Sequence, residues 1–128
     1  MNLTRLSGAL LAVALPFAVT GVATAASTDT ALSLTIAMPE GPATTVELRC
    51  EPADGTHPNP KDACADLLAV QGDFAALQAQ QEPMACTMEY RPVIAVADGT
   101  WRGEPVAWEQ EFSNPCTLRT STGPVFQF

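Results

Sequence analysis

Residues 84–97 read MACTMEYRPVIAVA and join two different kinds of sequence. The first part mixes polar and apolar residues, and it carries Cys86 two positions before the apolar Met88. The second part, residues 90–97, is rich in apolar and β-branched residues and predicts a strand. We therefore expect a short segment that a disulfide can tether and that leads directly into a sheet.

Two further strands are predicted on the N-terminal side of this stretch. Apolar side chains alternate with polar ones over residues 32–36 and again over residues 46–50, which is the pattern of half-buried strands. Residues 39–42, with the sequence PEGP, indicate a turn between them. The two strands are therefore expected to form a hairpin.

After this hairpin the sequence predicts a long loop and then two short helices. Residues 51–62 are rich in Pro, Gly, Asn and Asp, which is typical of a loop. Asp62 is the expected N-cap of a helix over residues 63–70. Asp73 is the expected cap of a second, shorter helix that ends near Gln78.

Turn residues place the remaining strands. Asp98-Gly99 is a strong hairpin signal at the end of the strand over residues 90–97. We expect the return strand over residues 101–112, a turn over residues 113–115, and a last short strand over residues 125–128. The order of elements predicts an α+β fold, with a five-stranded antiparallel sheet, two short helices on one face and two disulfides. An apolar outer face would need cover, which favours a homodimer.

The N-terminus has the features of a targeting signal. Arg5 is followed by an apolar run over residues 10–19, which is shorter than the roughly 20 residues that span a bilayer. Residues 23–25, with the sequence ATA, fit a cleavage site. We therefore expect residues 1–25 to be a cleaved signal peptide and residues 26–128 to be one secreted, extracellular domain; an uncleaved signal-anchor is the alternative.

The composition excludes some partners. The chain has a net charge of −8, and nucleic acids and anionic membrane surfaces attract basic patches instead. We therefore expect neither nucleic acid nor a membrane as a partner once the signal peptide is removed.

All four cysteines lie after the predicted signal peptide. An even number of cysteines in an exported chain indicates disulfides. Three pairings are open, and we favour the sequential one, Cys50–Cys64 with Cys86–Cys116. In the loop-closure model each bridge contributes about 3 to 4 kcal/mol. Zinc is disfavoured because no two cysteines are two to four residues apart and His57 is the only histidine, so we expect no metal and no other cofactor.

The sequence lacks the motifs that would indicate an enzyme. It contains no Gly-x-Ser-x-Gly nucleophile elbow and no phosphate-binding glycine loop. His57 lies in a Gly-Thr-His-Pro loop, and we interpret it as structural or exposed and not as a general base. The fourteen acidic residues are scattered and single out no catalytic pair. We therefore expect no catalytic activity.

Several stretches together resemble the Streptomyces subtilisin inhibitor-like family and follow its order. They are residues 46–50 (VELRC), 55–58 (GTHP), 63–67 (ACADL), 84–93 (MACTMEYRPV), 98–101 (DGTW), 112–116 (FSNPC) and 125–128 (VFQF). The resemblance extends over nearly all of the chain after residue 25. Each piece alone is a weak signal, but the ordered set is specific.

The resemblance implies a secreted inhibitor of serine proteases. It implies a five-stranded antiparallel sheet with two helices, homodimers formed through the sheet, and the pairing Cys50–Cys64 with Cys86–Cys116. The partner would be a secreted protease of the subtilisin type or of the chymotrypsin type.

The resemblance also implies the site. The reactive bond would lie between Met88 (P1) and Glu89 (P1′). The rest of the protease-contacting loop would be Met84, Ala85, Cys86, Thr87, Tyr90 and Arg91. The support of the loop would come from Asn114 and Pro92.

The residue types in this loop fit such a role. A methionine is usually core filler, but beside a disulfide anchor we expect Met88 to be exposed and to suit a large apolar S1 pocket better than the acidic pocket of trypsin. Thr87 stands where family members often carry proline, and Glu89 places a carboxylate directly after the reactive bond. Glu89 and Arg91 lie on the same side of an extended chain and can pair. The alternative function is an extracellular protein-binding module on the same scaffold, with weak or no protease inhibition.

Overall fold

The computed structural model describes residues 12–21 and 29–128. Residues 12–21 contain no helix or strand, and they are exposed. The predicted cleavage site lies outside the described residues, so residues 1–25 as a signal peptide stay a prediction. In the described part of the chain, no helix has the length and apolar character needed to cross a membrane.

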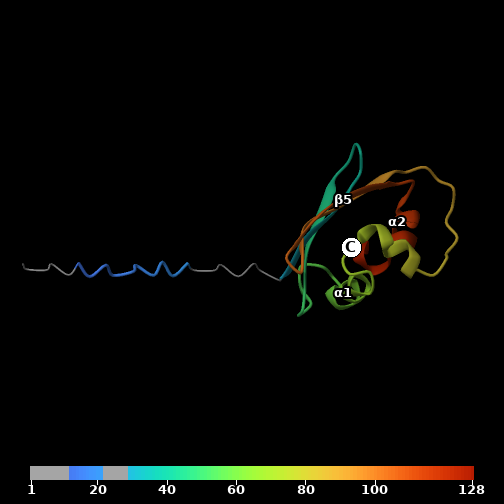
Figure 1. Ribbon diagram of the computed structural model, residues 1–128. Helices are drawn as coiled ribbons and strands as arrows, with labels where there is room; N and C mark the ends of the chain where they lie inside the picture. Colours follow the sequence, from blue (N-terminus) through green and yellow to red (C-terminus); the bar gives the residue numbers. More distant parts are fainter. Residues whose placement is uncertain (1–11, 22–28) are drawn as a thin grey trace, which may run out of the picture.

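Five antiparallel strands of the described chain form one sheet in the order β3-β2-β1-β4-β5 (Figure 1). They are β1 (Thr30–Ala37), β2 (Ala43–Cys50), β3 (Asp54–Gly55), β4 (Val93–Trp101) and β5 (Glu104–Phe112). β1 lies at the centre and pairs with β2 on one side and with β4 on the other. The sheet therefore joins the chain before residues 82–92 to the chain after them.

Alternation of side chains gives the sheet one apolar face. Leu32, Leu34 and Leu48 are fully buried, whereas the residues that follow them in sequence are half-buried or exposed. Burial of one such side chain stabilises a fold by about 1.5 to 3 kcal/mol. The predicted strands over residues 32–36 and 46–50 are thus confirmed.

Helical segments cover this apolar face (Figure 1). They are α1 (Pro60–Ala69), η1 (Phe74–Gln80), α2 (Pro115–Thr122) and η2 (Gly123–Phe126), where η denotes a 3-10 helix. Leu67 of α1, Leu77 of η1 and Phe126 of η2 are at most 1% exposed. The disulfide Cys50–Cys64 ties the end of β2 to α1. The predicted α+β fold, with a five-stranded antiparallel sheet, helices on one face and two disulfides, is confirmed.

The hairpin between β4 and β5 turns at Arg102 and Gly103, and the predicted turn at Asp98-Gly99 is wrong. Both predicted turn residues lie inside β4 and pair with β5. Gly99 has φ +134°, and a Cβ atom there would lie 2.1 Å from the carbonyl oxygen of Ala31. The glycine therefore allows the β1 backbone to approach closely, and it does not mark a turn.

The C-terminal segment is helical, and the predicted strand over residues 125–128 is wrong. Val125 and Phe126 lie in η2 and are buried, with the Phe126 ring centroid 5.7 Å from that of Trp108. These apolar residues enter the core from a helical turn instead of from a sheet edge. Residues 113–115, predicted as a turn, lead into α2, which the sequence analysis did not predict.

The ends of several helices and strands also differ from the prediction. α1 begins at Pro60, after Asn59, and Asp62 is not its N-cap. The Asp62 carboxylate instead accepts a hydrogen bond from the Asn59 side chain at 2.7 Å. β4 begins at Val93 and not at residue 90, and β3 falls in a segment predicted as loop. Asp73 caps η1 as predicted, because its carboxylate accepts a backbone N–H of the first turn at 3.0 Å.

The outer face of the sheet is mainly polar. Ile94 and Val96 are half-buried there, and the register places a set of four acidic residues on the same face, the outer-face carboxylates: Glu47, Asp98, Glu109 and Glu111. The homodimer prediction assumed an apolar outer face. Carboxylates share this face with Ile94 and Val96, and the homodimer stays a prediction.

Candidate functional site

Residues 82–92 form a surface loop between η1 and β4 and contain no helix or strand. In Figure 1 this loop forms an arm at the side of the helical layer that leads into β4. Met84 and Tyr90 are each 72% exposed, and Met88 is 99% exposed. Clustered exposed apolar side chains mark interaction sites, so the loop is the candidate functional site.

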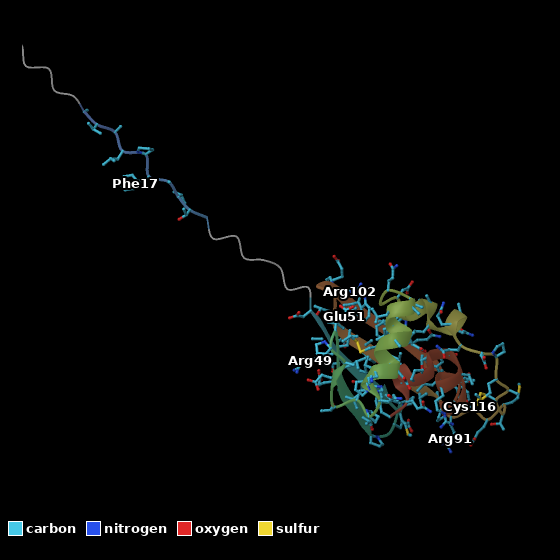
Figure 2. All side chains as sticks on the ribbon, turned by 90° about the horizontal axis from the view of Figure 1, so that it is seen from below. Phe17, Arg49, Glu51, Arg91, Arg102 and Cys116 are labelled. Carbon is cyan, nitrogen blue, oxygen red and sulfur yellow. A yellow bond between two sulfur atoms is a disulfide. The ribbon has the colours of Figure 1, made fainter. Side chains whose placement is uncertain are left out.

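A disulfide fixes the middle of the loop to the helix behind it. Cys86 is bonded to Cys116 in the first turn of α2, with 5.8 Å between their Cα atoms. Figure 2 shows Cys116 and Arg91 at one end of the domain, far from Arg102 at the other. Both disulfides follow the sequential pairing that we favoured. The second bridge holds the backbone two residues before Met88.

Asn114 braces the loop from beneath and is only 3% exposed. Its side-chain Nδ2 donates hydrogen bonds to the carbonyl oxygens of Thr87 at 3.1 Å and of Glu89 at 2.8 Å. Its Oδ1 accepts the backbone N–H of Thr117 at 2.9 Å. Because both ends of the carboxamide are engaged, the two carbonyl groups on either side of Met88 are held in place.

The sequence Asn-Pro-Cys-Thr explains why Asn114 is itself held. Asparagine is a preferred N-cap, and proline at the next position fits the first turn of a helix. Thr117 completes a capping box, because its Oγ1 also accepts the Asn114 backbone N–H at 3.2 Å. Cys116 lies in the same turn, so one helix start supplies both the brace and the disulfide.

Two backbone features hold the far end of the loop. The Arg91 N–H donates to the carbonyl oxygen of Ser113 at 2.9 Å. Pro92 is half-buried and leads into β4. The Arg91 guanidinium lies 3.8 Å from the Glu89 carboxylate, and these side chains are 63% and 59% exposed. An exposed ion pair contributes under about 1 kcal/mol, so the backbone contacts and not this pair hold the loop.

The single histidine has a structural place. His57 is 3% exposed, and its Nδ1 accepts the Asn59 N–H at 2.9 Å. Nε2 therefore carries the proton and donates it to the Val125 carbonyl oxygen at 3.0 Å. Both ring nitrogens are occupied by the backbone, so His57 is not placed to act as a general base. Among the described residues, no three His, Cys, Asp or Glu side chains are grouped so that they could hold a metal ion.

An ion pair with perturbed pKa values lies at the other end of the domain. Glu51 and Arg102 are joined by two hydrogen bonds between guanidinium and carboxylate, and Figure 2 shows them far from Cys116. This hydrogen bonding lowers the pKa of Glu51 and raises the pKa of Arg102. The pair links the β4–β5 turn to the residue after β2 and takes no part in the loop.

The structure brings together the residues that the sequence analysis assigned to the loop and to its support. Cys86 meets Cys116, and Asn114 lies beneath Thr87 and Glu89. Sequence reasoning missed two features, the backbone bond to Ser113 and the N-cap role of Asn114. The second had a usable signal, because Asn followed by Pro is a frequent helix start.

Comparison with known proteins agrees with this geometry. A family model described as Subtilisin inhibitor-like matches residues 28–114. The chain belongs to the subtilisin inhibitor-like family. This subtilisin inhibitor-like chain is 46% identical over 104 residues to Subtilisin inhibitor-like protein 5 of Streptomyces fradiae, a match that covers 77% of this chain and 96% of that protein. It is 40% identical over 84 residues to a Transglutaminase-activating metalloprotease inhibitor of Streptomyces mobaraensis, covering 65% of this chain and 57% of that protein.

A solved structure of the subtilisin inhibitor-like family is also similar. Sermetstatin of Streptomyces caespitosus, in complex with Bacillus licheniformis subtilisin, has a TM-score of 0.66 and 35% sequence identity. The match covers 78% of this chain and 99% of sermetstatin. Of the two relatives compared by sequence, one is named as an inhibitor and the other as an inhibitor-like protein. The family consists of protease inhibitors and not of enzymes.

Proposed function

We propose that this chain inhibits secreted serine proteases of the subtilisin type. In this proposal residues 84–91 form a substrate-like loop, and the reactive bond joins Met88 to Glu89. One observation carries the proposal: Asn114 holds the carbonyl groups on both sides of Met88, while the Met88 side chain is 99% exposed. A protease S1 pocket can accept such a side chain without first ordering the backbone.

The bracing lowers the entropic cost of binding. Fixing the backbone of one residue costs roughly 1 to 2 kcal/mol, and a flexible peptide meets that cost when it enters a protease cleft. Here the disulfide at Cys86 and hydrogen bonds at Thr87, Glu89 and Arg91 order the loop during folding. More of the interaction energy with the protease is then available as affinity.

The chemistry of Met88 indicates the class of protease. Its side chain is unbranched and apolar, which suits the hydrophobic S1 pocket of subtilisin-like and chymotrypsin-like enzymes. The S1 pocket of trypsin contains an aspartate and selects Lys or Arg. We therefore assign Met88 as the residue that enters S1, and a protease with an apolar S1 pocket as the partner.

The same proposal makes the chain an extracellular protein, with residues 1–25 as its signal peptide. The two disulfides support export, because such bonds persist in oxidising compartments. Two copies would associate through the outer face of the sheet, which the helices leave uncovered (Figure 1).

Titration of subtilisin, chymotrypsin and trypsin with the purified protein tests the proposal. We expect stoichiometric inhibition of the first two, and Met88→Lys should shift the preference towards trypsin. Met84→Lys is the matched control, because it makes the same change at another exposed methionine of the loop. If Met88→Lys and Met84→Lys have the same inhibition profile, Met88 does not enter the S1 pocket.

The alternative is an extracellular binding module that does not block proteases. Thr87 and Glu89 favour it, because one lacks the restraint of a proline and the other places a carboxylate after the reactive bond. Prolonged incubation with subtilisin separates the two functions. Rapid cleavage after Met88 with undiminished protease activity would support the binding module. A metalloprotease in the same panel tests whether this chain also inhibits metalloproteases, the class that appears in the name of the Streptomyces mobaraensis relative.

A further inference from the structure

The exposed apolar side chains of the domain gather at one end. Among residues 29–128, the exposed large apolar side chains are Met38, Leu68, Met84, Met88 and Tyr90. The last three belong to the loop over residues 82–92, and Met38 lies in the turn between β1 and β2. Leu68, on α1, is the exception. An apolar surface that continues beyond the loop indicates a larger contact area than the loop alone provides.

The sheet register brings the β1–β2 turn beside the end of the loop. Ala37, the last residue of β1, pairs with Ile94, the second residue of β4. Because the two strands are antiparallel, Met38, the next residue after Ala37, lies beside Val93 and Pro92. A hollow of about 400 Å³ lies between the two segments, lined by turn residues 38–41 and by the loop end with Pro115.

The turn has a defined shape before any partner binds. The Gly41 N–H donates to the Met38 carbonyl oxygen at 3.2 Å, and the Met38 N–H donates to the Pro42 carbonyl oxygen at 3.5 Å. Met38 is 47% exposed, so about half of its surface is available to a partner. A preordered turn loses little conformational freedom on binding.

We propose that the β1–β2 turn is a second contact surface for the protease, with Met38 as its apolar anchor. The hollow beside it would receive an apolar side chain from the protease surface next to the cleft. This contact would lie on the side where residues 89–92 leave the protease cleft. This inference rests on the proposed function, because the protease held at Met88 is the same molecule that reaches Met38.

Interface size supports this assignment. A standard protease–inhibitor interface covers about 800 Å² on each partner and roughly 20 to 30 residues a side. Residues 84–91 are eight, so a tightly bound protease must also cover surface outside the loop. On the opposite side of the loop, the hollow beside Met84 is lined mostly by polar residues, among them Gln80, Gln81 and Arg119. Outside the loop, the exposed apolar side chain that lies beside it is Met38, and such side chains can serve as anchors of an interface.

Inhibition of subtilisin by Met38→Ala tests the second contact. We expect the inhibition constant to rise about fivefold, mainly through faster dissociation, as for a moderate interface residue. Leu68→Ala is the matched control, because Leu68 is 39% exposed and lies on α1. It should leave the inhibition constant unchanged. Met38→Leu keeps an apolar anchor of similar volume and should restore most of the affinity.

Hydrogen exchange gives a readout that needs no substitution. The backbone amides of Met38, Glu40 and Gly41 should exchange more slowly in the complex with subtilisin than in the free protein, whereas amides of α1 around Leu68 should not change. Unchanged exchange in the turn together with an unchanged inhibition constant for Met38→Ala would overturn the second contact. If those results accompany a Met88→Lys variant that does switch to trypsin, the reactive loop stands and the turn contact alone fails. If the wild-type protein inhibits none of the proteases, both proposals fail.

Discussion

Asn114→Asp should separate the bracing of the loop from the stability of the fold. Aspartate has nearly the same shape and is an equally good N-cap, so it can still accept the Thr117 N–H. It has no N–H₂ group, and the carbonyl oxygens of Thr87 and Glu89 therefore lose the donor that now lies 3.1 and 2.8 Å away. The carboxylate would also face these two oxygens. The loop around Met88 should become mobile while α2 remains in place.

The magnitude follows from the number of bonds lost. One neutral hydrogen bond contributes about 1 kcal/mol net, so two stabilise the ordered conformation of the loop by about 2 kcal/mol. A protease must then supply this free energy when it orders the loop. At about 1.4 kcal/mol per tenfold change, the inhibition constant should rise roughly 30-fold. Repulsion between the carboxylate and the carbonyl groups makes this a lower bound.

Two measurements test this reasoning. The first is the inhibition constant against subtilisin, and the second is the rate at which the variant is cut after Met88, followed by mass spectrometry. Both should rise for Asn114→Asp. Ser113→Ala is the control, because it keeps the backbone carbonyl that binds the Arg91 N–H. If Asn114→Asp inhibits as tightly and survives as long as the wild-type protein, the side-chain donor does not brace the loop.

Three further predictions concern other parts of the molecule. Glu89→Val should change inhibition constants unequally across proteases with different charge next to the S1 pocket; equal values throughout would show that Glu89 does not affect selectivity. His57→Phe should lower the free energy of unfolding in urea by about 1 to 3 kcal/mol, because it leaves the carbonyl oxygen of the buried Val125 without its hydrogen-bond partner. A loss below about 0.5 kcal/mol, the size of a surface substitution, would contradict the structural role of His57. Sedimentation should show a homodimer whose association strengthens with added salt, because the outer-face carboxylates of the two copies repel one another. Salt screens this repulsion, since the Debye length falls from about 30 Å at 0.01 M to about 3 Å at 1 M salt. A dimer insensitive to salt would indicate another contact face.

The sheet could be predicted where local chemistry and tertiary structure agree. Residues 32–36 and 46–50 alternate because one face of β1 and β2 is buried, and that burial leaves its pattern in the sequence. Gly99 misled the prediction because the glycine serves a contact with Ala31 on a neighbouring strand. A glycine needed for a close approach and a glycine needed for a turn look the same in a sequence.

The C-terminal helices were missed for a different reason. α2 has eight residues and only Leu118 and Thr122 are buried in it, which leaves too short an apolar period to recognise. Its start at Asn114-Pro115 has the sequence pattern of a turn, since both residues are common in turns. Residues 125–128 have the sequence pattern of a strand because Val and Phe favour strands, whereas contact with Trp108 in the core decides their conformation.

The candidate site was predictable in its residues but not in its surroundings. The resemblance named Cys86, Cys116 and Asn114, and the structure places Cys86 in the loop and both Cys116 and Asn114 against it. It carried no information on the bond from Arg91 to Ser113. It also could not place Met38 beside the loop end, because this neighbourhood arises from strand pairing between distant parts of the chain.

The disulfide between residues 86 and 116 joins the chain before the bond between residues 88 and 89 to the chain after it. A nick at that bond would therefore produce two fragments that remain one covalent molecule until a reducing agent is added. β1 from the first fragment would still lie between β2 and β4, and β4 belongs to the second. The new carboxylate and amine would stay neighbours, and their high effective concentration would favour re-ligation within the same molecule. Proteolysis at this point would be reversible, and the nicked protein could return to its uncut form on the enzyme that cut it.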